Sequence, residues 1–449
     1  MSPRFTRPAP QRPARRRARD RGFTLVELII AMAAGLAVAA AAVLLARNAS
    51  RFFQHEARMS SAHLAAVLGM NRLTTDLQRA AFLSTPNLRA DPNVCGTPGA
   101  WPDGVRKLAG ITLVRNGSVG AHPAELVQSM ANNMQPDAVI IGGTFNTTEQ
   151  FAVRAIIPGV SGGFAVYLHT QGEAADALRR TLQRLATPTS HGLDVLFRQG
   201  RILRVIAPGQ SKYMYGLITG LDVIGTANAP NEVVVRLGPN PALPFKENGC
   251  GIGTVATVGA FANPIARVKY DIRSVASYPT YAPLVAPISP EVTGDDRRTE
   301  LVRVELDGNN QEIDSTLELV AEYAVDLKFG ISVTSPLNDP SIDPVVTRYP
   351  IQTPELSPIY NITDENTGTP HVVRSVQVRL STRTRAPDRD TGLATGADGR
   401  PLRFFIPGIG GMNSPSDVQP GSMPVYARMR TLYAEVSLPN HVSAQVWPP

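Results

Sequence analysis

The chain carries no net charge once its first 22 residues are set aside. Residues 1–22 hold eight arginines and one aspartate, while the whole sequence of 449 residues holds 44 basic and 37 acidic residues. Residues 23–449 therefore contain 36 of each sign. This balance removes the compositional argument for nucleic-acid binding, which depends on a basic surface. Because 43% of the residues are hydrophobic, the chain can bury a core, and disorder throughout is excluded.

The sequence also lacks the patterns of common active and metal sites. It has no Walker A lysine motif, and its seven histidines form no metal-type pair. The G-x-S-x-G pattern at 159–163 lies between two strand-like stretches, whereas a hydrolase elbow needs a helix after the serine, so we expect a hairpin loop. Residues 249–253 are glycine-rich but precede no helix, and residues 388–392 start like a calcium loop without its later glutamate. We predict a protein that is not an enzyme and holds no cofactor or metal.

Proline is absent from residue 23 to residue 85, which favours a long helix. Residues 23–46 are an apolar run with one charge, Glu27, and about 20 such residues cross a bilayer as a helix. The arginines before the run place the N-terminus in the cytoplasm and the rest of the chain on the far side. Residues 47–83 are predicted to continue as an amphipathic helix. Its apolar residues recur at three- and four-residue steps: Val67, Met70, Leu73, Leu77 and Ala81.

Glu27 is the unusual residue of the apolar run. An isolated carboxylate within hydrocarbon costs at least about 2 kcal/mol and normally has a partner. A cut after Gly22 would give Phe23 a free amine, and the amine of a neighbouring subunit could then pair with Glu27. The alternative is a plain membrane anchor, in which Glu27 lies near the interface and reaches into water.

The string Arg21-Gly22-Phe23-Thr24-Leu25-Val26-Glu27-Leu28 resembles the cleavage signal of type IV prepilins and type II secretion pseudopilins. The resemblance implies that a prepilin peptidase removes leader 1–22 by cutting after Gly22 and methylates the new N-terminal Phe23. It also implies that Glu27 is the assembly residue. Two features depart from the family: the leader is long, and the helix lacks the proline that many major pilins have.

Residues 84–449 mostly show short alternating or apolar runs typical of strands. We expect strands at 138–141, 164–168, 202–206, 233–237, 268–272, 302–306, 317–329, 372–380 and 432–438, a helix at 172–186, and a hairpin turn at Asp307–Asn310. Residues 283–300 and 386–424 are expected to be long surface loops. The predicted class is α+β: a long N-terminal helix packed on a mainly antiparallel β domain, which is exported.

The order of these stretches resembles the PilW-type minor pilins, which share the layout of the J-type minor pseudopilins. The chain is longer than a usual member, so residues 145–195 and 280–300 are candidate insertions. Cys95 and Cys250 are the two cysteines, and the exported side of a membrane permits disulfides. They either pair, closing a loop worth about 5 kcal/mol, or remain as two thiols. Family members often have a cysteine just after the helix, where Cys95 lies.

The resemblance implies a structural minor pilin, resident in the inner membrane before assembly and in the pilus, periplasm or cell surface afterwards. Its implied partners are prepilin peptidase, other minor pilins, the major pilin and the inner-membrane assembly platform. Motility, adhesion or DNA uptake would follow. One alternative is a minor pseudopilin of a type II secretion system, and another is a membrane-tethered exported binding or hydrolase domain. Arg379, Arg383 and Arg385 line one strand face, either in solvent or as a docking surface for another subunit.

Overall fold

The computed structural model describes residues 24–159, 162–207, 212–245, 250–252, 259–334, 345–351, 358–387, 402–408, 412–413 and 424–444. The chain divides into two compact units, residues 1–57 and 58–449. Helix α1 (Leu25–Gln78) contributes its first part to one unit and its last part to the other. The second unit holds both β-sheets, so the predicted α+β class is confirmed.

The larger sheet of the second unit has ten strands and the smaller has five. The ten are β1 (Ile111–Val114), β2 (Ala138–Gly143), β3 (Phe151–Pro158), β4 (Phe164–Leu168), β5 (Ile202–Ile206), β6 (Tyr213–Gly225), β7 (Pro230–Leu237), β8 (Ala260–Arg273), β9 (Glu300–Leu306) and β10 (Glu312–Ala321). The five are β11 (Ala324–Thr334), β12 (Val346–Tyr349), β13 (Val373–Arg383), β14 (Arg403–Phe405) and β15 (Tyr426–Ser437). Shorter helices are α2 (Asp103–Arg106), α3 (Gly117–Ala121), α4 (Val127–Ala131), α5 (Asp176–Leu185) and α6 (Ile359–Ile362).

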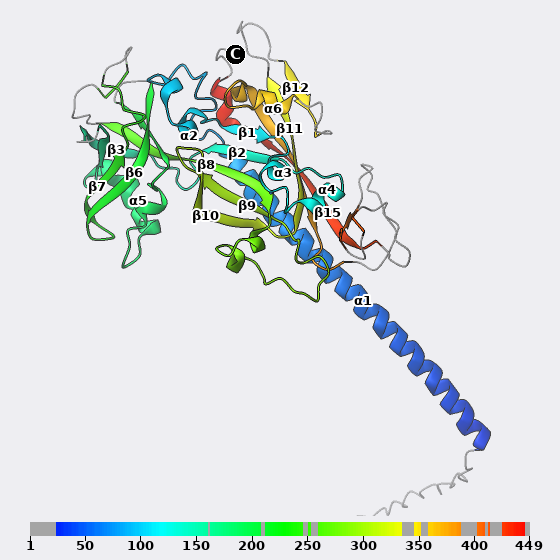
Figure 1. Ribbon diagram of the computed structural model, residues 1–449. Coiled ribbons are helices and arrows are strands. Elements are labelled where there is room, and N and C mark those ends of the chain that lie inside the picture. Colours follow the sequence, from blue (N-terminus) through cyan, green and yellow to red (C-terminus); the bar gives the residue numbers. More distant parts are fainter. Residues whose placement is uncertain are drawn as a thin grey trace, which may run out of the picture. The chain divides into compact units, whose positions relative to one another are not determined.

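Part of the larger sheet closes on itself. The first residues of β8 pair with β3 along one edge and with β5 along the other. Because β3, β4, β7, β6 and β5 follow one another by hydrogen bonding, these strands and β8 form a closed antiparallel ring. Its interior is a separate hydrophobic core that includes residues of α5. Figure 1 shows β3, β6, β7 and α5 grouped together, with β8 leading from them toward β9.

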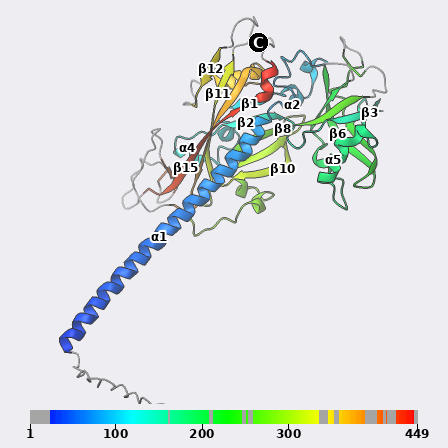
Figure 2. The ribbon, with the colours of Figure 1, turned by 180° about the vertical axis from the view of Figure 1, so that it is seen from behind.

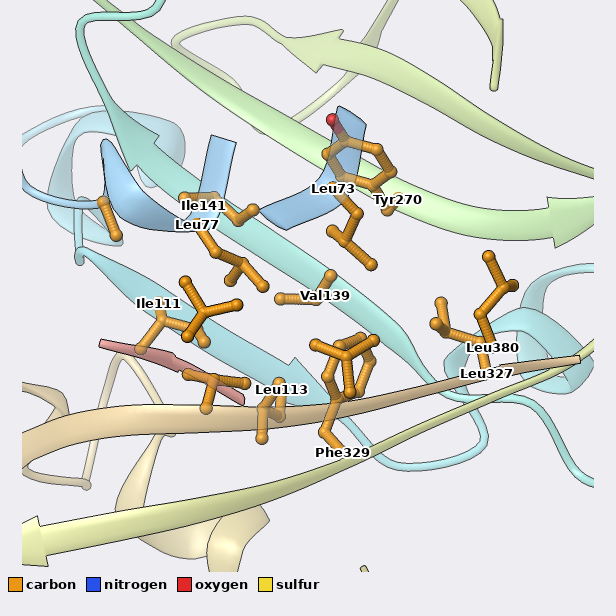
Figure 3. Close-up of a cluster of buried hydrophobic side chains, with 14 of the residues drawn as sticks. Leu73, Leu77, Ile111, Leu113, Val139, Ile141, Tyr270, Leu327, Phe329 and Leu380 are labelled. Carbon is orange, nitrogen blue, oxygen red and sulfur yellow. The ribbon is translucent and has the colours of Figure 1, made fainter. Parts of the chain in front are cut away.

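The second half of β8 belongs to the sheet that packs on α1. Here β8 pairs with β2 and β9, and β1 and β10 extend the sheet on either side. Leu73 and Leu77 of α1 are fully buried in the main core between this sheet and the smaller one (Figure 3). Burial of each such leucine stabilises the fold by about 1.5–3 kcal/mol. The predicted amphipathic pattern of α1 is thereby confirmed over its last part.

Helix α1 approaches the sheets closely enough to require a small residue at position 69. A Cβ atom added to Gly69 would lie 2.8 Å from the Cβ of Ala321 and 3.1 Å from Leu380. Two turns earlier, the hydroxyl of Thr382 donates a hydrogen bond of 2.8 Å to the carbonyl of Ala62. Figure 2 shows the end of α1 lying in front of strands of the larger sheet.

A buried carboxylate also binds α1 to the larger sheet. Asp76 is 1% exposed and accepts hydrogen bonds from Arg303 of β9 at 2.7 Å and from the Tyr270 hydroxyl of β8 at 2.8 Å. Its other oxygen accepts from Arg72, which also donates two bonds to Glu318 of β10. Burial works to lower the pKa of Arg303, but the adjacent Asp76 outweighs it and raises this pKa. Charges paired in this way keep the helix in one register on the sheet.

Helix α1 ends at Gln78, before the predicted boundary at residue 83. Ala81 and Leu83 have positive φ angles of 60° and 50°, which lie outside the helical region. The amide of Asn440, near the C-terminus, donates to the carbonyl of Gln78, the last residue of the helix, and to that of Ala80 two residues beyond it. The final turn of the chain therefore caps α1.

Two buried histidines lie beside this cap. His441 is 0% exposed and packs against Gly110. A Cβ atom added to Gly110 would lie only 2.2 Å from the Nε2 of His441. His371 is also 0% exposed, with its Nδ1 at 3.2 Å from the amide nitrogen of Asn87. Burial, together with the nearby Arg374, lowers the pKa of His441 to about 3 and that of His371 to about 4.

Cys95 and Cys250 form a disulfide, with Cα atoms 5.9 Å apart. Both residues belong to the core of the strand ring. The segment before Cys95 is also tied to β6, because Cys95 and Tyr213 share a backbone hydrogen bond of 2.9 Å. The irregular segment that follows α1 is therefore fastened to the ring.

The structure corrects several strand predictions. The stretch 317–329 is two strands, β10 and β11, separated by a turn at Tyr323 with φ 54°. Strand β6 was not predicted, and the candidate insertion at 145–195 covers only part of the ring. The strands at 164–168 and 202–206, the hairpin turn at Asp307–Asn310 and the helix within 172–186 are confirmed. Most of 386–424 lies outside the described residues.

The arginine face of β13 is buried rather than solvated. Arg379 is 4% exposed and pairs with Asp326 at 2.7 Å, and Arg383 is 1% exposed near the rings of Tyr323 and Phe404. Residues 283–300 cover part of this face, because Asp295 is fully buried and binds Tyr323 and Arg385. The prediction of a surface loop at 283–300 is therefore wrong at Asp295, where the segment is anchored in the domain.

We predict that Asp76→Asn strongly destabilises the second unit. The change leaves Arg303 buried without its carboxylate, and removing one partner of a buried pair costs about 3–5 kcal/mol. Urea unfolding of the full-length chain in detergent, followed by tryptophan fluorescence, measures the loss. Asp222→Asn is the control, because its pair with Arg236 is exposed and such pairs contribute about 1 kcal/mol or less. Equal effects of the two changes would contradict a special role for Asp76.

We also predict an acid-sensitive stability that depends on His441. In the unfolded chain histidine titrates near its ordinary pKa of 6.5, so on acidification the unfolded state binds the proton first. Stability is therefore unaffected above pH 6.5 and falls between pH 6.5 and 5 by up to about 1.4 kcal/mol per pH unit for each histidine. Glu300, whose pKa burial raises to about 7, acts in the opposite direction.

Because Glu300 is unchanged in every variant, the difference between variants isolates the histidine. His441→Gln should flatten the dependence of the unfolding free energy on pH between 6.5 and 5. His63→Gln, at an exposed position of α1, should leave it unchanged. An identical slope in wild type and His441→Gln would show that this histidine does not titrate on unfolding.

Candidate assembly site

The start of α1 is held by a reciprocal pair of side chains. The backbone nitrogen of Thr24 donates to Glu27 Oε2 at 3.0 Å, as does the Thr24 hydroxyl, and the nitrogen of Glu27 donates back to Thr24 Oγ1 at 3.3 Å. This is a capping box, in which residue N3 and the N-cap residue satisfy each other's free N–H groups. Glu27 therefore has a partner within its own chain.

The side chains of the apolar run around and beyond Glu27 are exposed along the length of that run. The large hydrophobic side chains from Leu25 to Leu45 are between 56% and 75% exposed. Helix α1 is long and apolar enough to cross a membrane. Because apolar surface is unfavourable in water by about 25 cal/mol per Å², this segment requires lipid or the apolar face of another helix.

Exposed apolar residues also occur on α1 where it packs on the sheets. Leu64 and Leu68 are 57% and 56% exposed, whereas Ala66, Leu73 and Leu77 are fully buried. The last part of α1 thus has one face fixed in the β domain and another that presents leucines outward. Such a helix can belong to its own domain and to a bundle of helices at once.

The structure places the predicted site residues as follows. Glu27 lies at the start of α1, whereas Gly22 and Phe23 lie outside the described residues. Pairing of Glu27 with an amine of a neighbouring subunit stays a prediction. Thr24 was missed as its partner within the chain, although the spacing Thr24-x-x-Glu27 is the sequence signal of a capping box.

The motifs set aside from sequence lie partly or wholly outside the described residues. Residues 159–163 join β3 to β4, which pair as a hairpin, and Ser161 lies outside the described residues. No group of three or more histidine, cysteine, aspartate or glutamate side chains among the described residues could hold a metal ion. Residues 388–392 lie outside them.

Comparison with known families adds one match. Residues 17–43 match the model of the prokaryotic N-terminal methylation motif. The chain carries a prepilin-type N-terminal motif. The motif supports a type IV pilin-like protein that is processed by prepilin peptidase, and together with the apolar helix it fits membrane anchoring. No curated protein and no solved structure matches the chain.

We predict that the prepilin-type motif is cut between Gly22 and Phe23. Mass spectrometry of the protein from its native host should give a mature N-terminus at N-methylated Phe23. Gly22→Val should block the cut, since the peptidase of this family acts after a glycine. Gly35→Ala is the control, because a Cβ there meets no atom within 4 Å and the position lies away from the cut. An intact leader, or a cut after the alanine-rich stretch, would contradict the prediction.

Proposed function

We propose that the chain is a structural minor pilin of a type IV pilus, of the PilW-like kind, and acts without catalysis. The observation that carries the proposal is the prepilin-type motif at residues 17–43, followed at once by an exposed apolar helix. Minor pilins of this kind help to begin pilus assembly together with other minor pilins, the major pilin and the inner-membrane platform. Motility, adhesion or DNA uptake would be the cellular outcome.

Assembly would draw on two features of α1. Its apolar run, exposed in the single chain, would be buried against neighbouring helices, which is a favourable change for each side chain that leaves water. Glu27 would then meet the amine of a neighbour's Phe23. The amine is cationic whereas the Thr24 donors are neutral, and attraction between opposite charges grows as the local dielectric falls, so Glu27 would exchange its bonds to Thr24 for the amine.

The β domain supplies what the filament would present outward. Its strand ring and its second sheet are joined to α1 through Asp76, Gly69 and the C-terminal cap described above. A subunit held by its helix would therefore carry the β domain on the last part of α1.

We predict that Glu27→Gln lowers incorporation into filaments by more than tenfold. The change leaves the neighbour's amine without its carboxylate in an apolar place, and such a loss costs about 3–5 kcal/mol. Processing and membrane insertion should remain normal. The measurement compares the variant in sheared pili with that in membranes, by immunoblot. Glu56→Gln, at an exposed position of the same helix, should incorporate like wild type.

A strain with the gene deleted and the Glu27→Gln strain together separate the alternative functions. Loss of pili on deletion of the gene supports the pilus, whereas loss of secreted enzymes with pili intact would assign the chain to a type II secretion system. Normal function of both machines in Glu27→Gln cells would favour a membrane-tethered domain whose motif has no role in assembly.

A further inference from the structure

The first unit ends in a short group of basic and aromatic side chains, which we call the collar: Arg47, Arg51, Phe52 and Phe53. All four are exposed, and the two phenylalanine rings contact each other edge to face with centroids 6.2 Å apart. Arg47 and Arg51 are four residues apart, so they lie on one face of α1, one turn from each other. No ion pair of either arginine occurs among the described residues.

The position of the collar follows from helix geometry. The apolar stretch from Leu25 to Ala46 has 22 residues and so spans about 33 Å at 1.5 Å per residue, close to the roughly 30 Å of a bilayer's hydrocarbon core. Arg47 is the first residue past the core, and Arg51 lies about 6 Å farther along. The polar layer on each side of the core is about 5–8 Å thick. Both guanidinium groups therefore fall at the level of the lipid headgroups.

The phenylalanines follow directly and can reach the same layer. Side chains of a helix lean toward its N-terminus, which here is the direction of the membrane. Their rings, 61% and 70% exposed, are accordingly directed back toward the headgroups.

The collar is also the only basic flank that the mature helix would keep. Removal of residues 1–22 takes away eight arginines, and between residues 23 and 57 the remaining charged residues are Glu27, Arg47, Arg51 and Glu56. The leader thus determines orientation while it is present. After its removal, the arginines nearest the membrane lie on its far side, at the collar.

We propose that the collar binds the anionic phosphate headgroups of the membrane's outer-facing leaflet and so sets the depth of α1. Arg47 and Glu27 are 20 residues apart, or about 30 Å along the helix. With Arg47 at one boundary of the hydrocarbon core, Glu27 lies at the opposite boundary, where a carboxylate contacts water. The inference rests on the membrane insertion that the proposed function includes, and extends it by naming the ligand and the residues that bind it.

The test uses the processed chain, purified from membranes and placed in nanodiscs of phosphatidylcholine and phosphatidylglycerol in equal amounts. Native mass spectrometry then counts the lipids that stay bound. We expect enrichment of phosphatidylglycerol, because a basic residue near an anionic surface favours binding by about fivefold, or about 1 kcal/mol. Arg47→Gln with Arg51→Gln should lose most of the enrichment. Phe52→Ser with Phe53→Ser should retain the preference, since the charges remain.

The matched control is Arg89→Gln with Arg115→Gln, which removes the same charge from exposed positions of the β domain. Equal loss in both double variants would show that net charge alone attracts the lipid, and would overturn the proposal. Absence of enrichment in the wild type would overturn it as well. Resistance of each variant to alkaline extraction is measured in parallel. A chain that is extracted contradicts membrane insertion itself, whereas an inserted chain without lipid preference contradicts only the collar.

Discussion

The ionic contact between Asp76 and Arg303 is the point on which the attachment of α1 depends. Hydrophobic packing alone lets a helix slide by a turn at modest cost, since one leucine can replace another against a sheet. A buried carboxylate with two specific donors resists sliding, because displacement would leave it buried without its bonds from Arg303 and Tyr270. Apolar burial thus supplies most of the stability, while Asp76 determines the register. For a subunit held in a filament by its N-terminal segment, that register fixes which face of the helix remains available to neighbours.

Segments far apart in the sequence meet at the end of this helix and make the attachment cooperative. The C-terminal turn caps α1 through Asn440, and the buried His441 packs on Gly110 just before the first strand. The segment that leaves α1 is fastened to the strand ring by the Cys95–Cys250 disulfide. Loosening any one contact therefore exposes the others. A closed ring with its own core lies beside the helix-bound sheet. Strand β8 belongs to both and passes continuously from one to the other, so the ring enlarges the β domain without adding to the contacts that hold α1.

Local signals in the sequence were enough for the helix and for several strands, and long-range pairing explains the failures. The run without proline and the period of Leu73 and Leu77 predicted α1 because a helix depends on neighbours three and four residues away. The strands at 164–168 and 202–206 are short apolar runs between turn residues. The ring could not be predicted, since it requires β8 to pair with β3 and β5, which no local pattern encodes. The arginines of β13 were left open between a solvated face and a docking surface, because strand alternation shows that Arg379 and Arg383 share a face but not that Gly294 and Asp295 bind Arg383 and Arg385. At the assembly site, Glu27 was identified from its charge, whereas its bond to Thr24 was readable and overlooked.

The capping box gives Glu27 a property that a bare carboxylate in the membrane would lack. In a single chain its charge is satisfied by the backbone and hydroxyl of Thr24, so the subunit can wait in the membrane without an unpaired group. Those donors are neutral, and a cationic amine competes with them successfully once water is excluded, because attraction between opposite charges grows as the local dielectric falls. The exchange is therefore weak in the hydrated interface and strong inside a helix bundle. Under the proposed function, the same residue would keep the free subunit stable and make its incorporation favourable only where neighbouring helices have already displaced water.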